Sequence, residues 1–133
     1  MSGDNALTLK KQGELIHAID QNGMDTILKP LTKEIYLFDT YIAGTSHIDD
    51  QSVFDEIKAG DSLILLREKN RYDDKAIVVK TKDKKKLGYI PERDNAIFSR
   101  LMDAGKMLTA HVDNIEKKGS YILVNIKIYL VDF

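Results

Sequence analysis

Apolar and polar residues alternate near the C-terminus of the chain with a period of two. The apolar positions are Ile122, Val124, Ile126, Ile128 and Leu130. Such alternation predicts an antiparallel strand with one buried and one exposed face. We predict this strand over residues 121–131 and a partner strand over residues 107–115, with a turn between them at residues 117–120.

Further strands are predicted upstream, where short apolar runs end at turn-forming residues. They cover residues 35–43, 62–67, 76–81 and 86–90. The segment between the last two carries a run of lysines: Lys80, Lys82, Lys84, Lys85 and Lys86. This segment is either a solvated hairpin tip that keeps a sheet edge from aggregating or a basic patch that follows a phosphate backbone.

Two short helices are predicted between the strands from their capping residues. Ser52 opens the first helix as a variant of the capping box, and this helix runs to residue 58 before Gly60 ends it. Asp94 or Asn95 caps the second helix, which runs to residue 103. The predicted apolar face of the second helix consists of Ala96, Ile97, Leu101 and Met102.

The N-terminal residues show a helical rather than a strand-like apolar pattern. Two helices are predicted, separated at Asn22 and Gly23, and Pro30 ends or kinks the second one. These helices either pack their apolar stripe on the sheet or bind a partner protein. We therefore predict a helical extension over residues 1–34 and one compact β-rich unit over residues 35–133.

These elements predict a fold that is mainly β with short helices, an α+β arrangement. Short strands separated by turn signals are typical of a small OB-like, partly open β-barrel, here with the N-terminal helices packed on it. A chain of 133 residues is long enough to bury one hydrophobic core without disulfides or metals.

Composition narrows the class of protein. The chain has no cysteine, which excludes disulfides, thiolate zinc sites and a cysteine nucleophile. It shows neither a membrane-spanning apolar run nor a signal-peptide pattern, so we expect a cytoplasmic protein without a membrane partner. The net charge is −1, but residues 1–60 carry five Lys+Arg against ten Asp+Glu, whereas residues 61–133 carry fifteen against eleven. A local basic face is therefore compatible with the nearly neutral total.

The sequence contains no recognisable catalytic constellation, so we predict a protein that is not an enzyme. Motifs for phosphate-binding loops, dinucleotide binding, zinc proteases and serine hydrolases are absent. The three histidines, His17, His47 and His111, are widely spaced, and we expect neither a metal nor a cofactor. The acidic pairs at residues 49–50 and 73–74 are either turn caps or magnesium ligands of a nuclease.

A polar segment with aromatic and basic residues follows the predicted strand at residues 62–67. Because it is a loop held between two buried strands, it is a candidate binding site. Tyr72 offers a stacking surface, and Arg67, Lys69 and Arg71 supply positive charge to steer a phosphate backbone. A purely structural interpretation is also open, in which Tyr72 buries its ring and the neighbouring polar residues cap turns.

Four motifs in this order resemble those of a HIRAN domain. They are I-A-G-T at residues 42–45, G-D-S-L-I-L-L-R-E at 60–68, N-R-Y-D-D-K-A-I at 70–77 and L-G-Y-I-P at 87–91. The resemblance covers the chain from about residue 36 onward and is to the standalone bacterial kind of HIRAN protein. It implies an OB-like barrel with added helices.

The resemblance also implies a binding site for the 3′ end of single-stranded DNA. In the family, aromatic side chains hold the terminal bases, and an aspartate accepts a hydrogen bond from the 3′-hydroxyl. Asn70, Tyr72 and Asp73 match the loop positions with these roles. His47 matches the position of the second stacking aromatic residue, and Tyr89 matches a histidine position after the glycine of L-G-Y-I-P.

Two positions depart from the family pattern. A family arginine corresponds to Ser46, and a phosphate-binding lysine corresponds to Glu92, although Arg93 follows it. Losing two cations weakens the electrostatic part of nucleic-acid binding. We predict a non-enzymatic module that binds nucleic acid, in particular single-stranded DNA and its 3′ end. The alternative is a protein-interaction domain that keeps the HIRAN fold without binding DNA.

Overall fold

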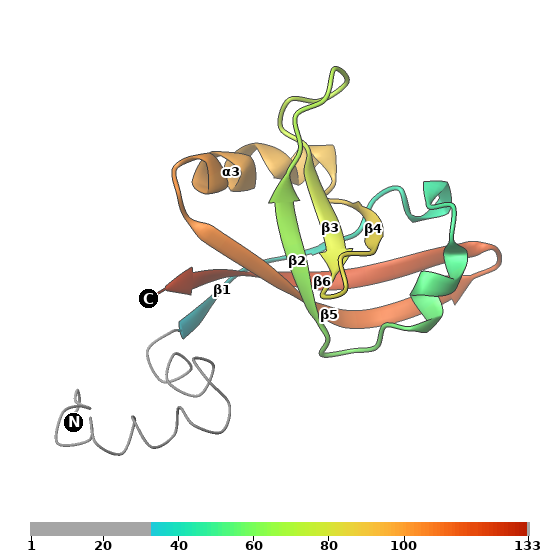
Figure 1. Ribbon diagram of the computed structural model, residues 1–133. Helices are drawn as coiled ribbons and strands as arrows, with labels where there is room; N and C mark the ends of the chain where they lie inside the picture. The colour runs from blue at the N-terminus through green and yellow to red at the C-terminus, as the bar shows by residue number, and fades with distance from the viewer. Residues whose placement is uncertain (1–32, 133) are drawn as a thin grey trace, which may run out of the picture. The chain divides into compact units, whose positions relative to one another are not determined.

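The structure is a computed structural model that describes residues 33–132 of the chain. This part is mainly β, with one α-helix and two short 3₁₀ helices (Figure 1). Its elements in chain order are β1 (Lys33–Tyr41), η2 (Thr45–His47), η3 (Gln51–Asp55), β2 (Ser62–Arg67), β3 (Ile77–Thr81), β4 (Lys86–Tyr89), α3 (Glu92–Asp103), β5 (Met107–Lys118) and β6 (Tyr121–Asp132). The predicted strands are confirmed, with bounds that differ by a few residues.

The strands form one six-stranded sheet in the order β1-β6-β5-β2-β3-β4. Strand β2 pairs antiparallel with both β3 and β5, and the β3–β4 and β5–β6 pairs are antiparallel hairpins. The β5–β6 hairpin shifts its register between Val112 and Asn114. Such an irregularity increases the local twist and bends the strands, which helps the sheet to curl.

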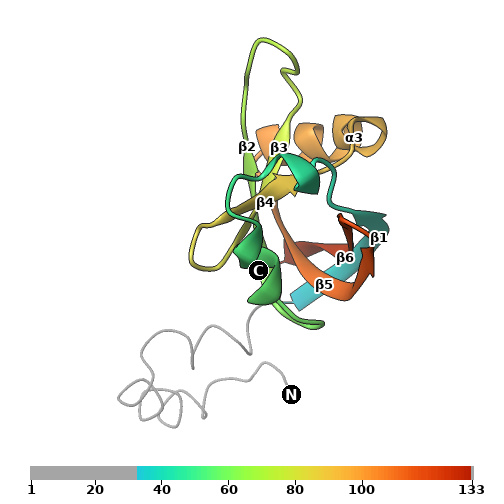
Figure 2. The same cartoon turned by 90° about the vertical axis from the view of Figure 1, so that its right-hand side faces the viewer.

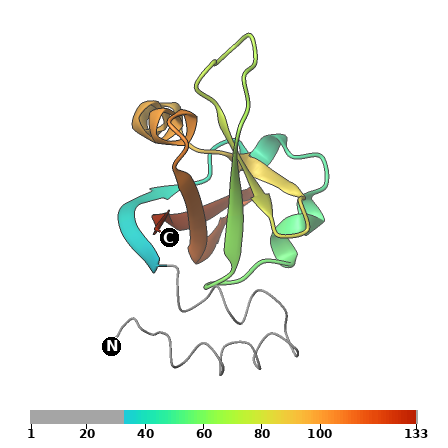
Figure 3. The same ribbon diagram turned by 60° about the vertical axis from the view of Figure 1, so that its left-hand side comes forward.

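The segment that follows β1 closes the sheet on itself. The amide of Ile42 donates to the carbonyl oxygen of Val124 in β6 at 3.0 Å. Ala43 exchanges two backbone hydrogen bonds with Tyr89 in β4, with N to O distances of 2.7 and 2.9 Å. Because β6 and β4 lie near opposite ends of the strand order, this segment joins the two sides of a curled half-barrel (Figures 2 and 3). It also places Ala43 beside Tyr89.

The hydrophobic core fills the inner face of the curled sheet. Its buried side chains include Ile42, Phe54, Leu63, Ile77, Leu87 and Ile90. The alternation predicted for β6 is confirmed: Val124, Ile126 and Ile128 are buried, and Ile122 and Leu130 are partly buried against this core. The period-two pattern therefore correctly predicts which face of β6 is buried.

Helix α3 packs on the core through a face that differs in part from the predicted one. Phe98 is buried, and Leu101 and Met102 are partly buried, as predicted for the latter two. Ala96 and Ile97 are exposed, and Ile97 keeps 67% of its surface accessible. The prediction for these two residues was wrong because the large Phe98 ring sets which face of the helix turns inward.

Both predicted helix caps were wrong. The carboxylate of Asp50, not the side chain of Ser52, caps η3, and it accepts a hydrogen bond from the Ser52 amide at 3.1 Å. Helix α3 begins directly after Pro91, and no side chain caps its first turn. Asp94 and Asn95 instead bond to residues in other elements, which a cap prediction from local sequence does not consider.

The helices predicted in residues 1–34, and a partner site on them, lie outside the described residues apart from the first positions of β1. Within residues 33–132, α3 is too short and too polar to cross a membrane.

Candidate functional site

A groove lies between the long β2–β3 loop, residues 68–76, and the end of β4. Figure 1 shows this loop extending beyond the ends of β2 and β3. Its lining residues are Ala43, Gly44, Asn70, Tyr72, Asp73, Ala76, Tyr89, Ile90 and Glu92. We call it the tyrosine groove, and its volume is about 360 Å³. It brings together four of the predicted binding residues, Asn70, Tyr72, Asp73 and Tyr89, with Glu92 beside them.

Asn70 sets the shape of the loop at the groove. Its side-chain oxygen accepts hydrogen bonds from the amides of Tyr72 at 2.9 Å and Asp73 at 2.8 Å. This arrangement is an asparagine turn, which a short polar side chain makes with the backbone that follows it. The turn holds Tyr72 outward with 83% of its surface exposed. The alternative in which Tyr72 buries its ring is therefore wrong.

Asp73 is fixed through both of its carboxylate oxygens. Oδ1 accepts a hydrogen bond from the amide of Lys75 at 2.9 Å, so this residue does cap a turn. Oδ2 accepts one from the side-chain amide of Asn95 at 2.9 Å. Asn95 belongs to α3 and is only 3% exposed, so the loop is tied to the core of the domain at this point. Each carboxylate oxygen has a second lone pair, which leaves Asp73 able to accept a further hydrogen bond.

Tyr89 is held on the opposite wall by two charged neighbours. Its hydroxyl donates to Glu68 at 2.6 Å and accepts from the ammonium of Lys86 at 2.8 Å. Glu68 also accepts from the side-chain amide of Asn70 at 3.1 Å, which links the two walls. The hydrogen bond from Tyr89 is the main reason why the pKa of Glu68 lies below its ordinary range, against the opposing effect of desolvation.

Arg71 lies beside the exposed tyrosine of the loop. One of its guanidinium nitrogens donates to the Tyr72 hydroxyl at 3.1 Å, and its central carbon lies 5.1 Å from the centre of the Tyr72 ring. A cation over an aromatic ring at this distance is attracted by the negative face of the ring. The predicted basic residue therefore accompanies the predicted stacking residue.

Arg67 is bound within the protein. Its guanidinium donates to both carboxylate oxygens of Asp103 in α3, at 2.9 and 3.2 Å. It also donates to the carbonyl oxygens of Ala76 at 2.6 Å and Asp74 at 2.8 Å. The ion pair lowers the pKa of Asp103. Arg67 thus clamps the base of the β2–β3 loop to α3.

Three further residues of the predicted site line other hollows. His47 lies in a hollow with Asp50 and Lys86, next to the β3–β4 hairpin. Lys69 lies in a hollow at the base of the loop, on the side of α3. The guanidinium of Arg93 lies 5.2 Å from the centre of the Tyr41 ring in yet another hollow. The structure therefore does not place His47 and Tyr72 in one hollow.

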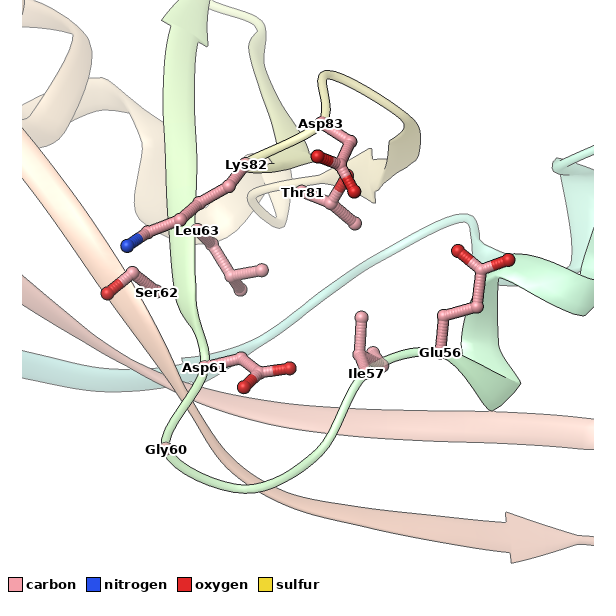
Figure 4. Close-up of a pocket in the computed structure, with 9 residues that line it drawn as sticks. All are labelled: Glu56, Ile57, Gly60, Asp61, Ser62, Leu63, Thr81, Lys82 and Asp83. Carbon is pink, nitrogen blue, oxygen red and sulfur yellow. The ribbon is translucent and has the colours of Figure 1, made fainter.

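A separate polar hollow of about 370 Å³ lies between the turn before β2 and the β3–β4 hairpin (Figure 4). Its lining residues are Glu56, Ile57, Gly60, Asp61, Ser62, Leu63, Thr81, Lys82 and Asp83. It shares none of them with the tyrosine groove. Among residues 33–132, no three histidine, aspartate or glutamate side chains converge as a metal site would require.

Two residues that support the groove were not identified as site residues from the sequence. Asn95 anchors Asp73, and Glu68 anchors Tyr89, each through a side chain more than twenty positions away. Glu68 belongs to the motif at residues 60–68, and this position next to a candidate loop is the one signal that could have pointed to it. Asn95 gives no such signal, because its burial follows from the packing of α3.

Comparison with known proteins identifies the family of this chain. The family model of the HIRAN domain matches residues 35–131. No curated protein matches the chain. A crystal structure of a protein from Lactobacillus plantarum is similar to this chain, with 27% sequence identity and a TM-score of 0.71 over 77% of this chain and 99% of that one.

The crystal structure of the HIRAN domain of human HLTF is also similar, with a TM-score of 0.58 and 13% identity over 75% of this chain and 78% of that one. At this identity the likeness concerns the fold alone. HIRAN domains are a family of nucleic-acid-binding modules. Because the family model spans nearly all of the described residues, the chain belongs to the HIRAN domain family.

Proposed function

We propose that the chain is a nucleic-acid-binding module that takes single-stranded DNA into the tyrosine groove, with the 3′ end at Asp73. The observation that carries this proposal is the outward Tyr72, 83% exposed, next to a carboxylate fixed on both oxygens. The exposed ring offers an aromatic surface to a ligand. A base stacked on such a ring contributes about 1–3 kcal/mol and requires no particular sequence.

The carboxylate of Asp73 gives the groove a preference for a chain end. An ionised carboxylate accepts a strong hydrogen bond from a hydroxyl group, whereas it repels a phosphate at the same place. Asn95 and the Lys75 amide already hold Asp73 in position, so binding a 3′-hydroxyl requires little reordering of this side chain. A free 3′-hydroxyl is therefore favoured over a 3′-phosphate or an internal nucleotide.

Fluorescence polarisation with short single-stranded DNA tests this proposal. Oligonucleotides that end in a 3′-hydroxyl or a 3′-phosphate are titrated with the protein at low and near-physiological salt. We expect tighter binding of the hydroxyl form, and Asp73→Asn is expected to reduce the difference between the two ends.

Tyr72→Ala should weaken binding by about 5- to 150-fold, which corresponds to the loss of one stacked base. Tyr121→Ala is the matched control, because Tyr121 is also partly exposed but lies at the turn of the β5–β6 hairpin. The control should bind as the unmodified protein does. If Tyr72→Ala folds normally and keeps full affinity, the groove is not the binding site.

A second candidate function is protein interaction, and the exposed apolar residues of β1 favour it. Ile35, Tyr36 and Phe38 keep 43%, 51% and 41% of their surfaces exposed on a strand at the end of the sheet order. Such neighbouring apolar side chains are typical of contact surfaces. Light scattering distinguishes the candidates: a dimer that Phe38→Ser dissociates supports protein interaction, and a monomer that binds DNA argues against it.

A further inference from the structure

The tyrosine groove is rich in negative charge for a site that receives a polyanion. Asp73 and Glu92 line it, and Glu68 lies against Tyr89 on one wall. Among the described residues that line the groove, none is a lysine or an arginine. A phosphate can therefore approach only where a cation at the rim offsets these carboxylates.

Several cations near the groove are engaged with other groups. Arg67 donates hydrogen bonds to Asp103 and to two carbonyl oxygens at the base of the loop. The Lys85 ammonium pairs with Glu56 at 2.9 Å, on the side of the other hollow. Arg93 lies over the Tyr41 ring and 3.6 Å from the Asp94 carboxylate. None of these contacts directs a positive charge at the groove.

Lys86 of the β3–β4 hairpin reaches a tyrosine of the groove with its ammonium. Nζ donates to the Tyr89 hydroxyl at 2.8 Å and lies 4.5 Å from the centre of the Tyr89 ring. Tyr89 in turn is fixed by Glu68. An ammonium has three donors, and the hydrogen bond to Tyr89 uses one of them. Lys86 itself lines the hollow with His47, and its ammonium, with two donors left, lies at the hydroxyl of the groove residue Tyr89.

The arrangement repeats on the opposite wall, where Arg71 lies over the Tyr72 ring and donates to its hydroxyl. Each tyrosine of the groove therefore carries one cation at its hydroxyl. We propose that Lys86 binds a backbone phosphate of the nucleic-acid strand in the tyrosine groove, and so supplies charge that Ser46 and Glu92 do not. This inference rests on the proposed function and adds a phosphate contact to it.

The salt dependence of binding tests the proposal, because each phosphate contact adds to the slope of log K against log salt. For single-stranded DNA, removing one contact is expected to reduce the slope by about 0.7. Lys86→Met should show this reduction and bind more weakly at low salt, with a difference from the unmodified protein that narrows as salt rises. Lys86→Arg should restore the slope.

Lys82→Met is the matched control, because Lys82 lies in the same hairpin but lines the separate hollow of Figure 4. Its slope should equal that of the unmodified protein, and thermal unfolding checks that each variant folds. An unchanged slope in Lys86→Met, with DNA binding retained, overturns the role of Lys86 and leaves the proposed function standing. An equal reduction in both lysine variants also overturns it, because it shows general attraction. If the unmodified protein binds no DNA at any salt, both the proposed function and this inference fail.

Discussion

Gly88→Ala is expected to destabilise the domain strongly, because Gly88 lies where the sheet closes. It is a buried residue of β4 with φ at +153°, a backbone conformation that only glycine adopts without strain. A methyl group added there would collide with the carbonyl oxygen of Ala43 and the side chain of Ile42. Both belong to the segment that joins β6 to β4, and the carbonyl oxygen is backbone that cannot turn aside.

The expected cost follows from these two effects. A backbone conformation of this kind costs about 1–3 kcal/mol for a residue other than glycine. Forcing extra atoms into a packed site costs a similar amount, about 1–3 kcal/mol. Together they predict that Gly88→Ala lowers the free energy of unfolding by roughly 4 kcal/mol. For a domain of this size, that corresponds to a fall in Tm of roughly 15 °C.

Thermal unfolding followed by circular dichroism measures this loss, and Gly119→Ala is the matched control. Gly119 also has a positive φ, +64°, but an added methyl group there meets no atom within 4 Å. Only the backbone strain remains in the control, which predicts a loss of about 1–2 kcal/mol. If Gly88→Ala loses no more stability than Gly119→Ala, the close approach of Ala43 to β4 is wrong, and so is the closed end of the half-barrel.

Two further predictions concern charged residues at the base of the groove. Because the folded pKa of Glu68 is lowered, this residue contributes stability that is fully present above the ordinary glutamate pKa and is lost as pH falls through the lowered value. Glu68→Gln should remove this part of the pH dependence in urea denaturation, and identical pH profiles would contradict the link to Tyr89. Arg67→Lys should cost about 2 kcal/mol, because an ammonium cannot replace the fork that binds Asp103 and two carbonyl oxygens. Urea denaturation measures the cost, and a rise in the pKa of Asp103 by NMR confirms its cause.

The fold was predictable where a local pattern decides the structure. The alternation in residues 121–131 predicts β6 because each second side chain faces the core whatever the rest of the chain does. The first turn of α3 was not predictable in this way. Asp94 and Asn95 have the chemistry of caps, but Thr40 and Asp73 compete for their side chains from distant parts of the sequence. Such competition depends on the assembled domain, so no local rule resolves it.

The same contrast between local structure and contacts from distant parts of the sequence applies to the candidate site. Asn70, Tyr72 and Asp73 lie within four positions, and the turn that Asn70 makes is a local structure, so the sequence could place them together. The anchors of this loop come from β4 and α3 and depend on side chains more than twenty positions away. The His47 position is near in sequence to the Ala43–Gly44 wall, yet its side chain lies in a different hollow.

The positive charge available to a ligand depends on ion pairs that form only in the folded domain. The excess of lysine and arginine in residues 61–133 is compatible with a local basic face, but pairing decides how much of that charge a ligand meets. Arg67 forms an ion pair with Asp103, and Lys85 forms one with Glu56. These two cations therefore offer less of their charge to a phosphate. Arg71 and Lys86 lie at the hydroxyls of the two tyrosines that line the tyrosine groove. Under the proposed function, two phosphate contacts predict that salt weakens binding only gently and that stacking and end recognition supply most of the affinity. A module of this kind would select a free strand end rather than follow a long backbone.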